Sequence, residues 1–122
     1  MLVLFGGGDW LSVFLVETYV LKPEKQAELA AYKKKWRKFF GYKDGRLVSF
    51  KEVKSHRMFS QLVGGNADGF VEMFEFESLA GLERFLSKLV KSGYMTKLYP
   101  VFISLIVPGS RSTSVWAPYT YT

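Results

Sequence analysis

The sequence predicts an α+β fold, in which one four-stranded antiparallel sheet is covered on one face by two helices. Three observations support this prediction. Segments with the apolar spacing of strands and segments with the apolar spacing of helices follow one another in the order β-α-β-β-α-β. The predicted strands are apolar on both faces. The chain has 122 residues, 48% of them hydrophobic, which suits one domain with a single core.

The first half of the chain predicts one strand followed by one helix. Residues 11–21, "LSVFLVETYVL", are rich in β-branched and aromatic side chains and predict the first strand. Pro23 suits the first turn of a helix, where a backbone N–H has no partner in any case. The helix is expected to run to about Phe40 and to end at Gly41.

The second half begins with a long, imperfectly alternating segment. Residues 46–63 contain apolar side chains on both parities, and we expect a bulge or a bend within this second strand. Residues 64–69, "GGNADG", tolerate positive φ and predict a hairpin loop. The third strand is predicted at residues 70–77, "FVEMFEFE".

The remaining elements complete a second β-α-β unit. Ser78 is a suitable N-cap for a helix with apolar residues at helical spacing, and Gly93 is a suitable end. Residues 101–107, "VFISLIV", are nearly all apolar and predict the fourth strand. Two interleaved right-handed units of this kind form a ferredoxin-like fold.

The sequence predicts one domain between two terminal arms. We expect an N-terminal arm at 1–10, the domain at 11–108, and a C-terminal arm at 109–122. This second arm is either disordered or laid across a partner subunit, and its aromatic residues favour the latter. The opening residues lack the basic region and the long apolar run of a signal peptide. No apolar stretch approaches the length of about twenty residues that spans a membrane. A cytoplasmic protein without membrane association is therefore expected.

The stretch "YKKKWRKFF" at residues 32–40 combines cations with aromatic rings. At helical spacing the aromatic residues, together with Leu29, share one stripe, while the cations at 33–38 fall mostly on the other faces. Binding to nucleic acid by stacking needs exposed rings beside the cations. We therefore expect a solvated basic face, and nucleic acid is not expected as a partner.

Strands that are apolar on both faces predict a homodimer. In the first strand, Phe14 and Val16 have one parity, and Leu15 and Tyr19 have the other. Helices on one face leave the second apolar face uncovered in a monomer, and an exposed patch of that size is typical of an interface. A second copy of the chain, packed sheet to sheet, is the expected cover.

The element order, the two-sided strands and the segment "VETYVLKPEKQAEL" at residues 16–29 resemble the dimeric α/β-barrel superfamily, in particular its NIPSNAP-like and antibiotic-biosynthesis-monooxygenase-like branches. The resemblance covers roughly residues 11–107. It implies a homodimer whose sheets face each other and a pocket in each protomer between sheet and helices. Its members include cofactor-free monooxygenases, isomerases, haem-degrading enzymes and proteins of unknown role.

Polar side chains on the apolar strands are the candidate site residues. His56 is the only histidine, and Tyr19, Glu17 and Glu72 lie on strands predicted to be central. If the first and third strands are antiparallel neighbours, Glu17 and Glu72 approach each other, which raises the pKa of one of them. The competing interpretation is structural pairing of these carboxylates with cations such as Arg57.

No cofactor and no metal are expected. The chain has no cysteine and a single histidine, which disfavours thiolate and zinc sites. In the haem-binding relatives, the resemblance implies an axial ligand on a helix, and the predicted helices contain no histidine.

Two classes of function stay open on the sequence alone. The first is a protein that binds a small apolar or aromatic molecule and that acts as a cofactor-free monooxygenase or isomerase, with His56, Tyr19, Glu17 and Glu72 at the site. The alternative is a non-catalytic binding or assembly module whose basic helix faces meet an anionic partner, as the net charge of +6 permits.

Overall fold

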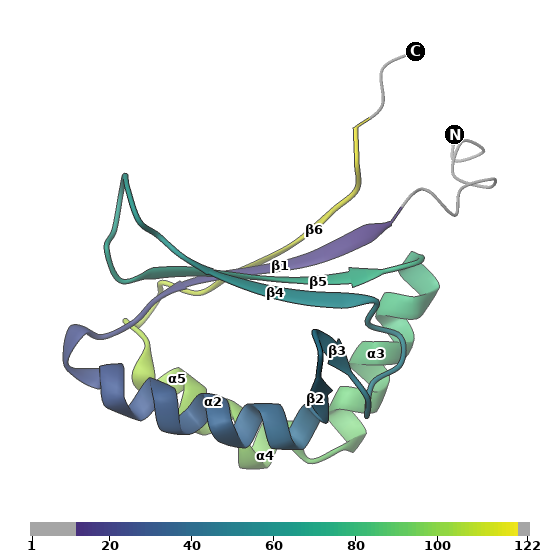
Figure 1. Cartoon of the computed structure of the whole chain (residues 1–122), viewed down its shortest axis with the longest axis horizontal. Helices are drawn as coiled ribbons and strands as arrows, with labels where there is room; N and C mark the ends of the chain where they lie inside the picture. Colours follow the sequence, from purple (N-terminus) through teal and green to yellow (C-terminus); the bar gives the residue numbers. More distant parts are fainter. Residues whose placement is uncertain (1–11, 120–122) are drawn as a thin grey trace.

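The structure of the protein, a computed structural model, describes residues 12–119, so the predicted N-terminal arm lies outside the described residues. Four strands form one antiparallel sheet in the order β4-β5-β1-β6 (Figure 1). They are β1 (Val13–Val20), β4 (Ser55–Ser60), β5 (Gly69–Phe76) and β6 (Ser112–Trp116). The two halves of the chain interleave in this sheet.

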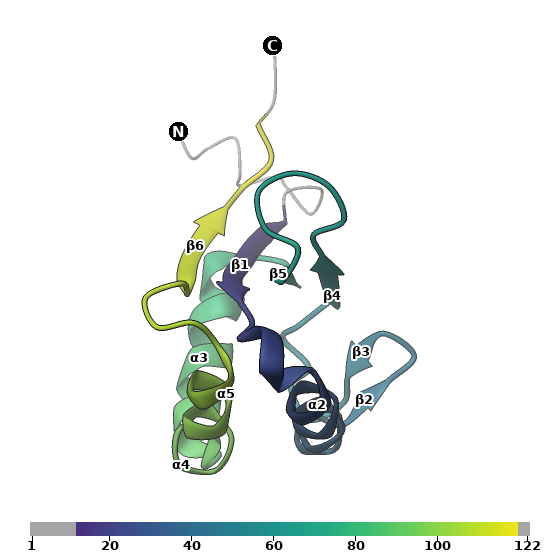
Figure 2. The same cartoon turned by 90° about the vertical axis from the view of Figure 1, so that its left-hand side faces the viewer.

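The helices lie on one face of the sheet in two groups (Figures 1 and 2). One group lies beneath the β4 side and the other beneath the β6 side, as Figure 2 shows. The first group is η1 (Pro23–Lys25) and α2 (Gln26–Phe40), and the second is α3 (Leu79–Lys91), α4 (Tyr94–Lys97) and α5 (Tyr99–Leu105). The predicted ferredoxin-like α+β fold is thereby confirmed. No helix within residues 12–119 is long and apolar enough to cross a bilayer.

The ends of the two long helices follow the local sequence. Pro23 begins the single turn that precedes α2, and Gly41 ends α2 in the left-handed conformation with φ of 66°. The hydroxyl of Ser78 accepts a hydrogen bond of 3.1 Å from the backbone N–H of Gly81 at the start of α3. These predicted helix boundaries are confirmed.

The prediction of a fourth strand at residues 101–107 is wrong, because most of this segment is the helix α5. Phe102, Leu105 and Ile106 are buried at spacings of three and one, whereas Val101 and Ile103 are exposed. This is the periodicity of a helix face. The sequence did not reveal it, because nearly every residue of the segment is apolar. The fourth strand is instead β6, which pairs with β1 and lies inside the segment 109–122, for which the sequence predicts an arm.

The prediction of one strand with a bulge or a bend over residues 46–63 is only partly correct, because β4 alone belongs to the four-stranded sheet. The segment consists of β3 (Arg46–Leu47), a turn region and then β4. Phe50 and Val53 lie in that turn region and are buried in the core. A further short strand, β2 (Tyr42–Lys43), pairs with β3 in a small separate hairpin at the end of α2. This hairpin was not predicted, because two-residue strands leave no periodic pattern.

The core lies between the sheet and the helices. The buried residues of α2 occupy one stripe, as predicted: Leu29, Tyr32, Trp36 and Phe40. On the sheet, the inner face contributes the buried residues Leu15, Tyr19, Phe74 and Phe76. The opposite face has no helix against it within residues 12–119 (Figure 1).

Candidate functional site

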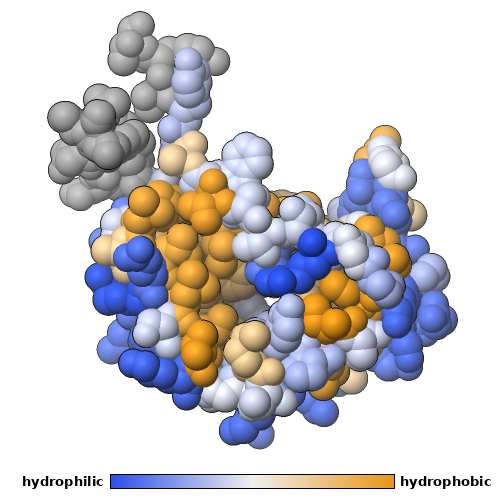
Figure 3. Space-filling view, turned by 180° about the vertical axis from the view of Figure 1, so that it is seen from behind, coloured by the Kyte–Doolittle hydropathy of each residue, from blue (hydrophilic) through white to orange (hydrophobic). Residues whose placement is uncertain are grey.

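A cavity of about 520 Å³ is lined by the inner face of the sheet and by both helix groups. Leu15 and Phe74 line it from the strands, and Phe85 and Phe102 line it from α3 and α5. Its outer lining includes exposed apolar residues of α3, α4 and β6: Leu86, Val90, Met95 and Val115. Figure 3 shows apolar side chains gathered around a hollow on this side of the molecule. The cavity walls are thus predominantly apolar.

Glu72 on β5 is the buried polar centre of the site and is only 6% exposed. Its Oε2 accepts hydrogen bonds from the Tyr19 hydroxyl at 2.7 Å and from Lys33 Nζ at 3.0 Å. Its Oε1 lies 2.9 Å from Nε2 of His56. An ionised carboxylate can only accept, so this nitrogen of His56 donates. Three donors therefore surround one carboxylate.

These contacts keep Glu72 ionised. Burial by itself raises the pKa of Glu72, but the hydrogen bond from His56, the charge of Lys33 and the hydrogen bond from Tyr19 together lower the pKa to about 2. Burial and the adjacent Glu72 carboxylate raise the pKa of Tyr19 far above its usual value. Tyr19 therefore remains a neutral donor to an anionic acceptor.

Glu17 on β1 is the register partner of Glu72, so the predicted approach of the two positions is confirmed. The predicted rise of a carboxyl pKa is not found at Glu72, whose pKa is lowered. Glu17 is paired with Arg111, whose Nε and Nη2 donate to its two carboxylate oxygens at 2.8 and 3.0 Å. Nη1 of Arg111 also contacts the hydroxyl of Tyr99 at 3.3 Å. Each of the two carboxylates therefore has its own cationic partner.

Of the four residues predicted for the site, two line the cavity and two lie behind it. Glu17 and Glu72 line it. His56 is covered by the rings of Trp36 and Phe74, with centroids 4.6 and 4.7 Å away, and reaches the cavity only through Glu72. Tyr19 likewise contacts Glu72. Among the cations of the predicted second strand, Lys54 pairs with Glu75 instead.

Two cations of the site were missed by the sequence reasoning. Lys33 was assigned to the solvated face of α2, but its side chain is 16% exposed, reaches Glu72 and lies 4.8 Å from the Trp36 ring centroid. Its position directly after Tyr32, four residues beyond Leu29, places it at the border of the buried stripe. Arg111 lies in the segment predicted as an arm. It could have been found as a site residue only if β6 had been recognised as a strand.

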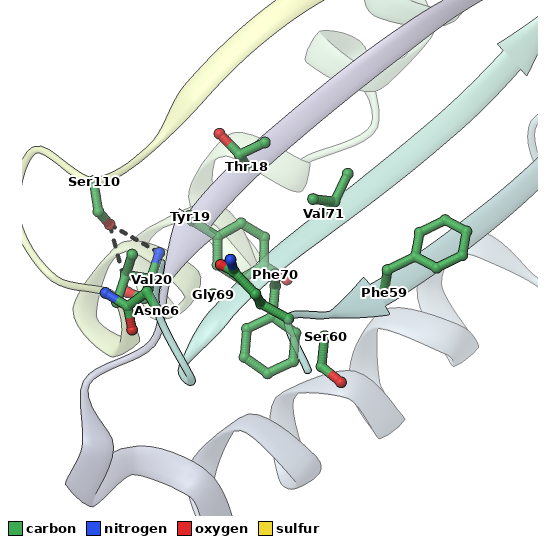
Figure 4. A pocket seen from close by; sticks show the side chains of 11 residues that line it. Thr18, Tyr19, Val20, Phe59, Ser60, Asn66, Gly69, Phe70, Val71 and Ser110 are labelled. Atoms are coloured by element: carbon green, nitrogen blue, oxygen red, sulfur yellow. Dashed lines mark hydrogen bonds between the residues drawn. The ribbon is translucent and has the colours of Figure 1, made fainter. Parts of the chain in front are cut away.

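A second hollow of about 370 Å³ lies at the base of the β4–β5 hairpin (Figure 4). Its lining includes Thr18, Phe59 and Val71, together with Ser110, whose hydroxyl accepts a hydrogen bond from the backbone N–H of Val20. No charged side chain lines it. Within residues 12–119 no group of three or more acidic, cysteine or histidine residues is placed to hold a metal ion. The larger cavity is therefore the candidate site.

The fold and this cavity define a ferredoxin-like α+β protein with an apolar internal site. No family model and no curated protein sequence matches the chain. Solved structures do match. A NIPSNAP family protein of unknown function from Agrobacterium tumefaciens has 14% identity and a TM-score of 0.64, and the match covers 91% of each chain.

Two further structures share the fold. An antibiotic biosynthesis monooxygenase has 13% identity and a TM-score of 0.56 over 90% of this chain and 99% of its own. A dimeric protein of unknown function with a ferredoxin-like fold from Bacteroides fragilis has 10% identity and a TM-score of 0.56 over 86% of this chain and 94% of its own. The resemblance seen in residues 16–29 is thus confirmed as a likeness of fold.

Proposed function

We propose that this protein binds a small, largely apolar or aromatic molecule in the cavity lined by the sheet, α2 and α3–α5. The observation that supports this function best is the cavity itself, about 520 Å³ with apolar walls and a few polar groups at one end. Ligand sites of proteins have this size and composition. The hydroxyls of Tyr32, Tyr94 and Tyr99 and the side chain of Thr113 lie along its wall and can orient a ligand.

Cofactor-free oxygenation or isomerisation in the same cavity is the catalytic form of this proposal. One structural neighbour is named an antibiotic biosynthesis monooxygenase, whereas the NIPSNAP neighbour has no known function. Glu72 and Glu17 are the predicted catalytic residues with access to a ligand, and His56 and Tyr19 act through Glu72. A carboxylate with a pKa of about 2 is a weak base, so the geometry supports orientation of a ligand more than proton abstraction.

We also propose that the protein is a homodimer in the cytoplasm. The sheet face opposite the helices contains Phe14, Val16, Val71 and Met73, whose side chains are only partly buried in the single chain, and Phe59, which is 48% exposed. A second copy packed on this face removes its apolar surface from water. The Bacteroides fragilis neighbour is described as dimeric, which supports this proposal.

A blocking variant tests ligand binding. Leu86 lies on α3 at the mouth of the cavity, and Leu79 lies on the same helix away from it. We expect the uncharged fluorescent probe phenylnaphthylamine to bind the wild type saturably. Leu86→Trp should weaken this binding at least about tenfold, because the larger ring enters the mouth. Leu79→Trp is the matched control and should bind as the wild type does; equal binding by both variants contradicts the proposal.

The alternative, a module for an anionic partner, is favoured by one observation. Exposed cations of α2 and the β2–β3 hairpin form no ion pair within residues 12–119: Lys34, Lys35, Arg37, Lys38, Lys43 and Arg46. Their summed charge favours a polyanion over a small apolar ligand. A salt titration of binding to random duplex DNA tests it, since affinity that falls steeply with salt and weakens in a Lys34→Glu/Lys38→Glu variant supports this alternative.

A further inference from the structure

A row of paired charges crosses the sheet at the polar end of the cavity. Lys33 and Glu72 form its first pair, with Nζ 3.0 Å from Oε2. Glu17 and Arg111 form its second pair, with two hydrogen bonds. Because Glu17 and Glu72 are register partners on adjacent strands, the two pairs lie side by side. The row therefore joins α2 to the start of β6 through the central strands.

The charges in this row cancel. It contains two carboxylates, Glu72 and Glu17, and two cations, Lys33 and Arg111. Within residues 12–119, no buried side-chain nitrogen or oxygen lacks a hydrogen-bond partner. A charged ligand in the cavity therefore finds no unpaired counter-charge, and it loses its hydration without compensation.

An uncharged ligand meets no such penalty. The walls offer apolar surface, the hydroxyl of Tyr99 lies 3.3 Å from Nη1 of Arg111, and Thr113 is the register partner of Glu17 on β6. These groups can donate to, or accept from, one hydroxyl or carbonyl of a ligand. An apolar molecule with one such group can pack against the apolar walls and form a hydrogen bond with a polar group of the wall.

We infer that the cavity selects uncharged apolar molecules bearing a hydroxyl or carbonyl group, and that the Glu17–Arg111 pair sets this selectivity. The inference rests on the proposed ligand-binding function and specifies the class of ligand. The pair is the accessible part of the row, since the side chains of Glu17 and Arg111 are 19% and 34% exposed, whereas that of Glu72 is 8% exposed. Removing one member of the pair leaves the other charge unpaired at the cavity wall.

Three matched probes test the inference by isothermal titration calorimetry near neutral pH. They share a naphthalene ring and differ in one group: naphthalenemethanol is uncharged, naphthoate is anionic and naphthylmethylammonium is cationic. We expect the wild type to bind naphthalenemethanol at least about tenfold more tightly than either ion. Glu17→Gln should change the preference to naphthoate, and Arg111→Gln should change it to naphthylmethylammonium.

Matched controls separate charge balance from loss of structure. The double variant Glu17→Gln/Arg111→Gln is neutral at this position again and should regain the preference for naphthalenemethanol. Glu24→Gln and Arg37→Gln change the same charges at exposed positions away from the cavity and should leave the preference unchanged. This pattern across all variants supports the inference.

Two other outcomes have distinct meanings. If the wild type binds naphthalenemethanol but binds an ionic probe equally well, or if the single variants weaken all three probes alike, the inference about charge is overturned and the binding function stands. If none of the three probes binds the wild type or any variant, the proposed binding function fails, and the inference fails with it.

Discussion

At the scale of single residues, Glu72 determines the character of the site. It is a buried carboxylate with three donors, from Tyr19 on β1, Lys33 on α2 and His56 on β4. Burying a charge without partners costs far more than a fold can tolerate, and the three donors offset that cost. Glu72 therefore links the helix α2 to the sheet as well as facing the cavity.

Glu72 also makes stability depend on pH in the acid range. The pKa of Glu72 is about 2 in the folded protein, against 4.5 for an unperturbed glutamate. The contribution of ionised Glu72 to stability is therefore present above pH 4.5 and is lost as pH falls towards 2. We expect Glu72→Gln to lower the free energy of unfolding at neutral pH by about 3 kcal/mol, because Lys33 and His56 lose their anionic partner.

Urea denaturation at several pH values measures both effects. Between pH 4.5 and 2 the wild type should lose more stability than Glu72→Gln, which has no group to protonate at this position. The exposed Glu77→Gln variant is the control and should follow the wild type. Parallel pH profiles for the wild type and Glu72→Gln contradict the assigned role.

At the scale of elements, α2 divides its cations between two environments. Lys34 and Lys38 are exposed, whereas Lys33 reaches into the core and pairs with Glu72. Trp36 is buried and packs against His56 and Phe40. The division follows from the helical period, which places position 33 at the edge of the stripe formed by the buried rings.

Substitutions along α2 test this division. Trp36→Ala should cost about 3 kcal/mol through loss of a buried ring. Lys33→Glu should cost about as much, because it places two carboxylates together in the core. The double variant Lys34→Glu/Lys38→Glu should fold with unchanged stability in chemical denaturation. If this double variant unfolds while Trp36→Ala and Lys33→Glu do not, the helix is rotated relative to the described packing.

At the scale of the whole molecule, the sheet has one covered and one uncovered face. All helices of residues 12–119 lie on the inner side (Figure 1). The outer face contains apolar side chains from β1, β4 and β5, including Val16 and Phe59. A monomer rarely leaves several large apolar side chains together on one uncovered sheet face, which is the physical ground for the proposed dimer.

We expect sedimentation equilibrium at micromolar concentration to give twice the monomer mass of 14.0 kDa. Val16→Glu should produce a folded monomer, because it buries a charge in the centre of the proposed interface. Val48→Glu makes the same change outside the four-stranded sheet, at a position that is 58% exposed. This control variant should remain dimeric. A wild-type mass of 14.0 kDa excludes the dimer.

Much of the fold could be predicted because it depends on local spacing. The stripe of α2, the cap at Ser78 and the β-branched and aromatic residues of β1 and β5 are local patterns, and the structure has these elements where they were predicted. The fourth strand could not be predicted in this way. β6 is an edge strand of mostly polar residues, while the more apolar α5 was mistaken for it. Edge strands bury little surface, so backbone pairing defines them more than hydrophobicity does.

The sequence by itself determined the fold class, the long helices and the neighbouring positions of Glu17 and Glu72 on adjacent strands. Only the tertiary structure decided the partners of these carboxylates. Lys33 is 39 residues from Glu72 along the chain, and Arg111 is 94 residues from Glu17. Whether a carboxylate gains or loses a proton depends on the charges and donors that packing brings to it, and no local spacing specifies them. Glu72 and Glu17 therefore belong to two separate ion pairs, which lie in the wall of an apolar cavity.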